Sequence, residues 1–457
     1  MAGKRTRKQA IIKRNIFLTV CSLVLVAAIV LVSFGISAVF KSCDGSKGGK
    51  TSGKSSSSNN STAQKEEKIK KVASAKVLNM GDIILHSTVL EGAYNRSTKD
   101  YDFSAFFPLM KEYIDGADLT VANLEVTLGG TESGKYSGYP AFNAPDSLID
   151  DLDDAGINFL LTSNNHSYDT GLFGLKRTAR VLKEKKMDFI GTRETESAPA
   201  YVVKKVNGIK IGMINYTYEN TCKTEGRKSL NGNIIAKEAN NLINSFSYDH
   251  IGDFYTEAKE VVKAMEKDGA EFIVFYMHWG NEYQLKQNTW QDKISQELCN
   301  AGVDIIVGGH PHVIQPIKML YSEDSSNETV CVYSLGNAIS NQRRELLNPE
   351  CTTGHTEDGL VFTFTLHKYS DGTVKLAEID VIPTWVDKYR GGSGYLYRMI
   401  PIETPEGSAQ KYKLSNSVLA DLKESYARTE KIISAGLTEC QQKIGCKVRY
   451  EQQQQAA

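Results

Sequence analysis

Six short, mostly apolar runs recur along the chain after residue 75, and each of them ends in polar side chains. The runs are rich in Val, Ile and Phe, which is typical of strands buried on both faces. Stretches with helical periodicity lie between them, and in FGLKRTARVLKEKK (173–186) Leu175, Ala179 and Leu182 form one apolar stripe. Strands that alternate with helices predict a layered α/β core with much parallel pairing. The six runs are KVLNMGD (76–82), DLTVANLE (118–125), INFLLTSNNH (157–166), FIVFYMHWG (272–280), VDIIVGGHPH (303–312) and VCVYSLGN (330–337).

The polar residues that end these runs are the first candidates for a functional site. In open α/β sheets, ligands bind beyond the carboxyl ends of the strands, so we expect these side chains to converge. A single histidine at a strand end is more often a surface or core residue, but four of the eight histidines occupy such ends. This recurrence favours a metal site over unrelated turns. The residues are Asp82, Asn123, Glu125, Asn165, His166, His278, His310, His312 and Asn337.

The residue types restrict the metal. Imidazole together with carboxylate suits Zn, Mn or Fe, whereas an all-oxygen set would favour Mg or Ca. In His310-Pro311-His312, proline favours an extended backbone at His310, and extended residues two apart project to the same side. A bridging carboxylate, Glu125 or Asp82, would hold two ions about 3.5–4 Å apart, and such a pair activates water for displacement at phosphorus. We therefore expect one or two divalent ions.

His166 has a different expected role. It directly follows Asn165 at the end of the third run, and the amide of Asn165 is itself a candidate ligand. A histidine that is not needed as a ligand can donate a proton to a leaving group near neutral pH. We therefore expect His166 to act as a general acid.

The first 70 residues differ from the rest of the chain. Residues 1–15 carry basic but no acidic residues, and residues 16–40 carry no charge. A helix of that length crosses a hydrocarbon core of roughly 30 Å and exceeds the roughly 7–15 apolar residues of a cleaved signal peptide. We expect an uncleaved transmembrane anchor, with residues 1–15 in the cytoplasm and the main domain outside the cell membrane. A lipoprotein signal at Cys43 is the alternative, although Phe40 and Lys41 stand where small or aliphatic residues are expected.

Linker composition, net charge and cysteine spacing limit the partners and metal ligands that can be expected. Residues 41–70, rich in Ser, Gly and Lys, are predicted to be a flexible linker. The whole chain has 54 basic and 54 acidic residues, so its charge predicts no nucleic-acid partner. None of the eight cysteines has CxxC spacing, so a zinc site made of thiolates is not expected.

Taken in order, the motifs resemble those of a known family. The resemblance covers about residues 75–390, and it is to the CapA family of capsule or poly-γ-glutamate synthesis proteins, whose fold is similar to that of calcineurin-like metallophosphoesterases. The motifs are Gly81-Asp82, Asn123-Leu124-Glu125, Phe142-Asn143-Ala144-Pro145, Asn164-Asn165-His166-Ser167-Tyr168-Asp169-Thr170-Gly171, His278-Trp279-Gly280-Asn281-Glu282, Gly309-His310-Pro311-His312, Ser334-Leu335-Gly336-Asn337, Thr356-Glu357-Asp358-Gly359 and Ile382-Pro383-Thr384-Trp385-Val386.

The resemblance implies a fold, a chemistry and a set of partners. It implies a four-layer αββα sandwich over residues 71–400 and a metal-dependent hydrolase site in which His166 is the catalytic acid. An anionic polymer such as poly-γ-glutamate and membrane synthase subunits are the implied partners. The implied metal ligands are Asp82, Glu125, Asn165, His278, His310 and His312.

The sequence also departs from ordinary metallophosphoesterases. Their first motif is Asp-x-His, but the histidine after Asp82 here is His86, which is either a ligand or a pocket residue. Their second motif offers an aspartate where this chain has the longer Glu125. Their third motif places an acid directly after the histidine, whereas here Ser167 follows and Asp169 is the nearest acid. These differences leave open the phosphatase activity and the number of metals.

Four further residues are candidates for binding substrate. Asn123 lies in the second motif, while Trp279 and Glu282 flank His278. Arg193, in GTRETE, is a candidate because arginine pairs bidentately with carboxylate or phosphate. The alternatives are that Trp279 packs in the core and that Arg193 is a solvated loop residue.

The last part of the chain has a different pattern. LVFTFTLHKY and VKLAEIDVIP flank SDGT and predict an antiparallel hairpin that completes the second sheet of a sandwich. Residues 401–457 are predicted to be a helical extension with a disordered Gln-rich end.

Three functions fit these expectations. The first is a membrane-anchored, extracytoplasmic protein of capsule or poly-γ-glutamate assembly that hydrolyses or transfers a phosphoryl or amide group. The second is a non-catalytic component of a synthesis or export complex, in which the pocket only binds polymer. The third is a general envelope phosphoesterase.

Overall fold

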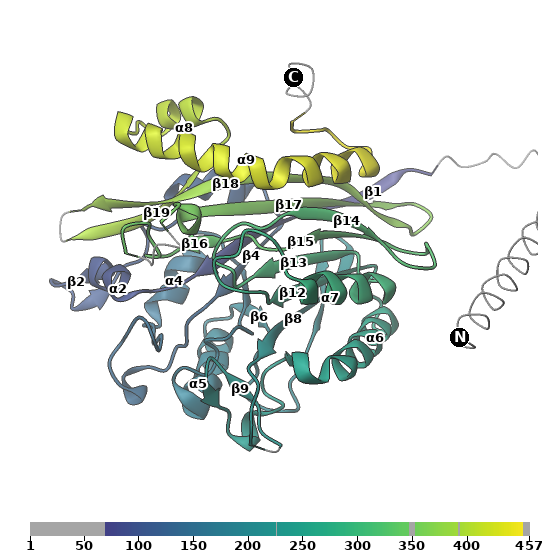
Figure 1. Cartoon of the computed structure of the whole chain (residues 1–457), viewed down its shortest axis with the longest axis horizontal. Helices are drawn as coiled ribbons and strands as arrows, with labels where there is room; N and C mark the ends of the chain where they lie inside the picture. Colours follow the sequence, from purple (N-terminus) through teal and green to yellow (C-terminus); the bar gives the residue numbers. More distant parts are fainter. Residues whose placement is uncertain (1–68, 225, 347–351, 392–393, 451–457) are drawn as a thin grey trace, which may run out of the picture. The chain divides into compact units, whose positions relative to one another are not determined.

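The computed structural model describes residues 69–224, 226–346, 352–391 and 394–450 (Figure 1). The expected cytoplasmic segment (1–15), the expected anchor (16–40) and all but the end of the expected linker (41–70) lie outside these described residues. Within the described ranges, no helix is long and apolar enough to cross a membrane.

Most strands belong to two large sheets. The first sheet has the order β19-β18-β17-β1-β4-β5-β6, with β16 also paired to β1, and the second has the order β11-β8-β12-β13-β15-β14, with β7 paired to β8. The first sheet comprises β1 (Lys71–Ile83), β4 (Leu119–Leu124), β5 (Phe159–Leu161), β6 (Asp188–Ile190), β16 (Asn337–Ile339), β17 (Asp358–Tyr369), β18 (Val374–Arg390) and β19 (Tyr395–Pro401). The second comprises β7 (Val202–Val206), β8 (Ile209–Glu219), β11 (Ser245–Ser247), β12 (Phe272–His278), β13 (Ile305–Gly309), β14 (Ile317–Tyr321) and β15 (Glu328–Val332). Two short pairs are β2 (Tyr94–Asn95) with β3 (Asp100–Tyr101) and β9 (Ser229–Leu230) with β10 (Asn233–Ile234).

The core is divided into layers because side chains alternate along each strand. In β1, Val77 joins the core between the two sheets, whereas Leu78 joins the core under the helices of the first sheet. In β12, Val274 joins the same inter-sheet core, and Phe275 packs under the helices of the second sheet. The order helices, sheet, sheet, helices confirms the predicted layered α/β core. The first sheet is covered by α2 (Ser87–Ala93), α3 (Lys111–Asp115), α4 (Ser147–Asp154) and α5 (Gly171–Glu184), and the second by α6 (Ile251–Lys267) and α7 (Thr289–Asn300).

The C-terminal part of the chain contains α8 (Pro405–Lys411) and α9 (Asn416–Ile444). Figure 1 shows α9, in yellow, running along β18, and α9 also contacts β14 at the edge of the other sheet. Ile433, Leu437 and Cys440 of α9 are fully buried in the inter-sheet core. This helix therefore closes one open side of the sandwich.

The predicted hairpin is present, but its sheet was predicted wrongly. β17 and β18 are antiparallel around the turn at 370–373, and β17 pairs with β1 in the first sheet instead of completing the second. Phe362 and Phe364 of β17 pack in the inter-sheet core, and Val361 packs on the opposite face. Alternation reveals such a strand, but it does not name the strand's neighbour.

Parallel pairing brings the polar strand ends together. β1, β4, β5 and β6 are parallel to one another, and so are β8, β12, β13 and β15. After β15 the chain crosses to the first sheet, and Leu335 N donates to Gly308 O at 3.1 Å while Gly336 O accepts from Asp82 N at 3.0 Å. β16 then places Asn337 opposite Asp82. The carboxyl ends of both sheets therefore meet at this crossing.

Candidate metal centre

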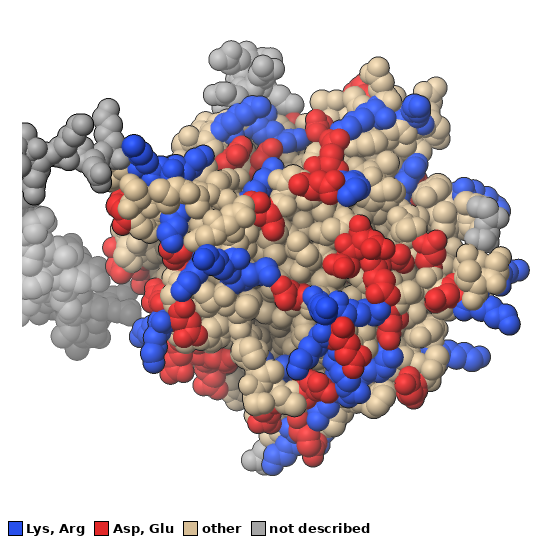
Figure 2. Space-filling view, turned by 180° about the vertical axis from the view of Figure 1, so that it is seen from behind, with Lys and Arg blue, Asp and Glu red and all other residues tan. Residues whose placement is uncertain are grey.

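Two carboxylates are buried at the ends of β1 and β4, although the charges on the surface are well mixed. Figure 2 shows basic and acidic side chains interspersed over one face of the molecule. Asp82 and Glu125, in contrast, are 0% exposed. Asp82 Oδ1 accepts a hydrogen bond from Asn123 Nδ2 at 2.7 Å, and Asp82 Oδ2 lies 3.2 Å from His312 Nδ1. In the described part of the chain, the ion-pair partners of these two carboxylates are all histidines.

Three histidines from the second sheet face these carboxylates. His278 is the last residue of β12, and its Nε2 lies 2.8 Å from Asn165 Oδ1 and 3.4 Å from Glu125 Oε1. The ring of His310 lies 4.9 Å from that of His278 and 5.9 Å from that of His312. The structure thus brings together, from both sheets, the six ligands that the resemblance implied.

Two buried atoms of this cluster have no hydrogen-bond partner. They are Glu125 Oε1 and His310 Nδ1. Leaving a buried polar atom unpaired costs about 1–3 kcal/mol, so such atoms call for a ligand. Ligand atoms of Glu125, His278 and His310 lie within 4.8 Å of one another, and so do those of Asp82, Glu125 and His312. Glu125 belongs to both groups, and this donor set fits a divalent metal.

The backbone at His310 and His312 differs from the predicted extended form. φ is +94° at His310 and +55° at His312, values that L-residues with side chains rarely adopt. Backbone strain of this kind costs about 1–3 kcal/mol per residue and gathers at functional sites. The two rings still converge, but a left-handed bend aims them instead of the alternation of a strand. Gly309 permits the approach, because a Cβ there would lie 2.9 Å from Asp82 Oδ1.

The electrostatics of the cluster couple its carboxylates to its imidazoles. Burial lowers the pKa of His310 well below its ordinary value, and the neighbouring His278 lowers it further. Burial also acts to lower the pKa of His312, but the charge of Glu125 and the hydrogen bond to Asp82 outweigh it and raise this pKa to about 9. Because metal ligands must be deprotonated, a bound cation would replace the proton of His312.

His166 is oriented by a carboxylate. Its Nδ1 lies 2.8 Å from Asp169 Oδ2, and Asp169 also accepts a hydrogen bond from Phe142 N at 2.7 Å. The ring of Phe142 packs edge-on at 4.7 Å from the His166 ring. With Nδ1 engaged, Nε2 is the nitrogen left for proton transfer. Asp169 completes a histidine–carboxylate pair, and the signal for it was an acid three residues beyond the histidine.

Comparison with known proteins identifies the family of the chain. Residues 76–342 match the family described as "Bacterial capsule synthesis protein PGA_cap". The chain belongs to this family. The resemblance of its motifs to the CapA proteins is thereby confirmed.

Two CapA proteins illustrate the relationship to this capsule-synthesis family. The chain is 28% identical over 273 residues to the "Capsule biosynthesis protein CapA" of Bacillus anthracis, covering 58% of this chain and 59% of that protein. It is 28% identical over 232 residues to the "PGA biosynthesis protein CapA" of Bacillus subtilis (strain 168), covering 50% of this chain and 52% of that protein. The chain thus spans about half the length of these relatives. Among solved structures, the calcineurin-like phosphoesterase YfkN from Bacillus subtilis aligns with 77% of this chain and 99% of its own, at 15% identity and a TM-score of 0.37.

In this PGA_cap chain, the asparagines around the cluster hold the ligands in place. Asn123 is only 6% exposed and donates to both Asp82 and Glu125, so it positions these carboxylates, and its contact with substrate stays a prediction. Asn164 Nδ2 donates to Asn123 Oδ1 at 3.3 Å and to Leu124 O at 2.8 Å. The sequence interpretation missed this role of Asn164, although its place in an Asn-Asn-His run at a strand end was a signal.

The other three predicted substrate residues lie in different surroundings. Trp279 is 0% exposed and packs on Tyr333, with its Nε1 bonded to Tyr333 O, so the packing alternative holds and the prediction that it lines the cleft is wrong. Arg193 is held by Asn244 Oδ1 and Asn241 O and is not among the residues of the cluster. Glu282 is exposed and has a carboxylate oxygen within 4.8 Å of ligand atoms of His310 and His312.

An open cleft of about 440 Å³ leads to the cluster. Tyr218, Tyr248, Glu282 and His310 line it. The ring of Tyr218 lies 4.8 Å from that of His310. His310, which is only 3% exposed, therefore forms part of the wall of this cleft.

His86 is partly buried beside Phe142 in this structure. Its Nδ1 accepts a hydrogen bond from Asn341 N at 3.2 Å, and its ring packs edge-on 5.5 Å from that of Phe142. Burial and the nearby His312 lower its pKa to about 4, so the ring is neutral at physiological pH. Among the described residues, the potential metal-binding groups do not include it.

Proposed function

We propose that this protein is a membrane-anchored, extracytoplasmic member of the capsule and poly-γ-glutamate synthesis family whose metal site hydrolyses or transfers a phosphoryl or amide group of an anionic polymer. The observation that carries the proposal is the pair of unpartnered buried atoms, Glu125 Oε1 and His310 Nδ1, at the meeting point of two parallel sheets. A purely structural cluster has no reason to leave both of them unpaired. The anchor is proposed from the uncharged run 16–40.

The roles of the residues follow from their contacts. Glu125, His278 and His310 would hold one divalent ion of Mn, Zn or Fe, and Asp82, Glu125 and His312 a second. A bound ion supplies an activated water and a Lewis acid for the attack. Asn165 joins the first group through its carboxamide oxygen, which lies 2.8 Å from His278 Nε2.

His166 would supply the proton that the leaving group needs. Asp169 holds His166 Nδ1 and orients the ring, so Nε2 is the nitrogen available to carry the transferable proton. A binding-only pocket has no use for this oriented pair. This geometry therefore favours catalysis over simple retention of polymer, and the polymer itself is the proposed partner together with membrane synthase subunits.

Complementation in cells tests the proposal. Cells that lack the native protein would receive the wild-type chain, His310→Ala, His166→Ala, or the control His367→Ala, a histidine on β17 outside the cluster. We expect the control to restore polymer and the two site variants to fail. The purified full-length wild-type chain should hold at least one metal per chain, and His310→Ala should hold less.

The same experiment separates the alternatives. A metal content below one per chain in the wild type would contradict both enzymatic functions. If His166→Ala keeps its metal and restores polymer, the protein acts by binding and not by catalysis. Turnover of generic phosphoesters that disappears in His166→Ala, together with normal polymer, would indicate a general envelope phosphoesterase. Cell fractionation of the full chain and of a chain without residues 16–40 tests the anchor.

A further inference from the structure

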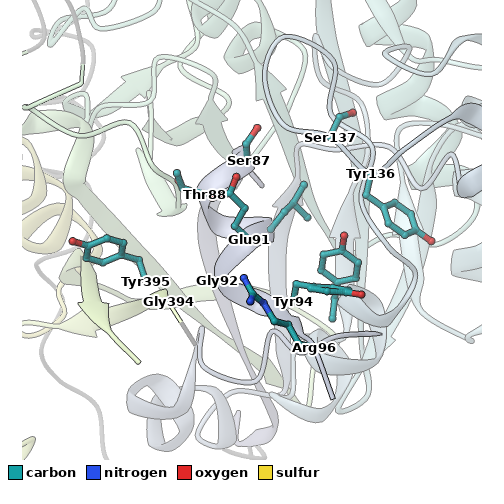
Figure 3. Close-up of a pocket in the computed structure, with 12 residues that line it drawn as sticks. Ser87, Thr88, Glu91, Gly92, Tyr94, Arg96, Tyr136, Ser137, Gly394 and Tyr395 are labelled. Atoms are coloured by element: carbon teal, nitrogen blue, oxygen red, sulfur yellow. The ribbon is translucent and has the colours of Figure 1, made fainter. Parts of the chain in front are cut away.

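A separate cavity of about 590 Å³ lies beside α2, and tyrosines and hydroxyl groups dominate its walls. α2 contributes Thr88 and Glu91, and the β2–β3 pair contributes Tyr94 and Tyr101. Figure 3 shows Tyr94 and Tyr136 on one side of α2 and Tyr395 on the other. The volume lies in the range of roughly 300–1,000 Å³ that is usual for ligand pockets.

This cavity shares a wall with the metal centre. Its lining residue Ser87 directly follows His86, whose ring packs against Phe142, and Phe142 in turn packs against His166. Another lining residue, Ser137, exchanges two backbone hydrogen bonds with Asn143, the neighbour of Phe142, at 3.0 Å each. The packed rings of His86 and Phe142 therefore connect the wall of the cavity to His166.

Hydrogen bonds also connect the cavity to His86. Thr88 Oγ1 lies 2.9 Å from the hydroxyl of Tyr397, which donates to Asn341 Oδ1 at 2.7 Å. The backbone N of Asn341 donates to His86 Nδ1, and Lys388 Nζ donates to Asn341 Oδ1 at 3.2 Å. The wall between the two sites is therefore held in a fixed arrangement instead of being a loose loop.

Three basic side chains lie in or beside the cavity. Arg96 lines it, and Lys388 Nζ and the guanidinium of Arg390 lie 4.9 Å and 5.2 Å from the ring of Tyr395, another lining residue. Within the described residues, none of these three cations has a carboxylate at ion-pair distance, whereas exposed basic residues elsewhere, such as Arg180 with Glu194, do. Glu91 is the acidic residue of the lining.

We propose that this cavity is a second binding site, which holds a stretch of a polycarboxylate chain while another stretch of the same chain reaches the metal centre. Arginine binds carboxylates through paired, charge-assisted hydrogen bonds, and lysine attracts them as a point charge. The tyrosine rings offer apolar faces for the methylene groups of such a chain and hydroxyls for its amides. The proposal rests on the proposed function, because it names the class of polymer that the metal site would act on.

The cations favour this ligand over a neutral glycan. Tyrosine faces and hydroxyls also suit sugars, but a sugar gives no partner to Arg96, Lys388 or Arg390. A chain with a carboxylate on every unit satisfies all three. A neutral oligosaccharide is therefore the competing outcome of the test.

The test is equilibrium binding to the full-length protein, with detergent present throughout. The probe is a fluorescently labelled decamer of γ-linked glutamate, followed by fluorescence anisotropy, and the matched uncharged probe is a decamer of γ-linked glutamine. We expect the glutamate decamer to bind at least tenfold more tightly than the glutamine decamer, and more weakly as salt is added. Arg96→Gln and Tyr136→Ala should each weaken its binding about tenfold.

Matched controls are available away from the cavity. Arg180→Gln removes an exposed arginine and Tyr321→Ala removes a tyrosine that is 45% exposed, and both should bind the decamer as the wild type does. Arg96 is exposed and Tyr136 is partly exposed, so their variants should keep the wild-type melting temperature. If Tyr136→Ala does not fold, Arg96→Gln with its rescue by Arg96→Lys decides alone.

Each result either supports or overturns the inference. Unchanged binding in Arg96→Gln and Tyr136→Ala, with loss in His310→Ala, overturns the second site and leaves the proposed function standing. Equal binding of both decamers, or tighter binding of a neutral oligosaccharide, overturns the polycarboxylate assignment. No binding of the glutamate decamer by the wild type also overturns it, and the polymer made in the complementation experiment then shows separately whether the proposed function fails.

Discussion

Two clusters of buried carboxylates lie in this protein, and their carboxylates have different partners. Around Glu357 and Asp358 the partners are arginines: Arg344 N and Nη2 donate to Glu357 at 2.9 Å and 3.1 Å, and Arg428 binds Asp358 through two contacts of 2.7 Å. Around Asp82 and Glu125 the partners are imidazoles, and one oxygen of Glu125 has none.

The difference in partners distinguishes a cluster that stabilises the fold from a cluster that is a candidate binding site. The arginine cluster joins the start of β17 to α9 and leaves no atom of its two carboxylates unpaired. Its carboxylates need no ligand, even though both acids lie in a segment that resembles a CapA motif. The imidazole cluster leaves one carboxylate oxygen and one ring nitrogen unpaired, and a divalent cation fits its donor set. Motif resemblance alone therefore does not distinguish the two kinds of site, whereas the partners of their carboxylates do.

The largest expected effect tests the completeness of the arginine cluster. Arg428→Met would leave Asp358 buried without its partner, and breaking a buried ion pair from one side costs about 3–5 kcal/mol. We expect the free energy of unfolding to fall by about 3 kcal/mol, as measured by chemical denaturation. Arg180→Met, at an exposed ion pair, is the control and should change it by less than about 1 kcal/mol. Equal effects of the two variants would contradict the comparison.

Metal should stabilise the other cluster by a comparable amount. A cation that binds only the folded state adds about 2.7 kcal/mol when its concentration is about 100 times its Kd. We expect Mn²⁺ or Zn²⁺ to raise the melting temperature of the chelator-treated protein and to have no such effect on His310→Ala. The control His367→Ala should respond as the wild type does. If neither metal nor chelator changed the melting temperature, the prediction that only the imidazole cluster binds a cation would be contradicted.

Neutralising one acid in each cluster should have opposite consequences. Without metal, Glu125→Gln removes a buried charge that has no basic side chain beside it other than histidine, so the unfolding free energy should stay unchanged or rise by about 1 kcal/mol. Glu357→Gln weakens contacts with Arg343 and Arg344 and should lower it by about 2 kcal/mol. Denaturation curves of both variants in chelator provide the measurement. A loss of stability in Glu125→Gln as large as in Glu357→Gln would contradict this difference.

The smallest effect is a pH dependence at the arginine cluster. Burial and the charge of Arg428 lower the pKa of His355 from 6.5 to about 4. The unfolded chain then binds more protons than the folded one between these values, so this stability is present above pH 6.5 and is lost as the pH falls towards 4. Because the side chain is partly exposed, we expect a contribution of about 1 kcal/mol. Comparing wild type with His355→Gln at pH 7 and pH 5 would measure it, and parallel curves would contradict it.

The convergence of the site residues could be predicted because strand ends can be recognised from the sequence alone. Apolar runs of strand length followed by Asp, Asn, Glu or His were enough to place His278 and His310 at strand ends, and the structure shows that these two strands are parallel neighbours. The family resemblance then supplied the expected ligand set, and the structure brings all of these residues together. Both steps depend on local patterns along the chain.

The features that could not be predicted from the sequence depend on contacts between segments far apart in the chain. The hairpin of β17 was recognisable, but its pairing with β1 depends on which edge is free when the chain returns. Trp279 and Arg193 looked like ligand contacts because of their residue types, yet Tyr333 and Asn244 occupy them. The positive φ of His310 was hidden because Pro311 favours the opposite conformation, and only the surrounding packing overrides that preference.

The crossing from β15 to β16 connects the two sheets beside the cluster. Gly336 lies against β1 so closely that a Cβ at Gly81 would stand 2.0 Å from Gly336 O, and the same crossing bonds to Gly308 of β13. The two sheets are therefore covalently continuous and in direct contact beside the ligands. An ion bound there would act as a cross-link between the two halves of the sandwich, so the rigidity of the protein and the occupancy of its site would vary together.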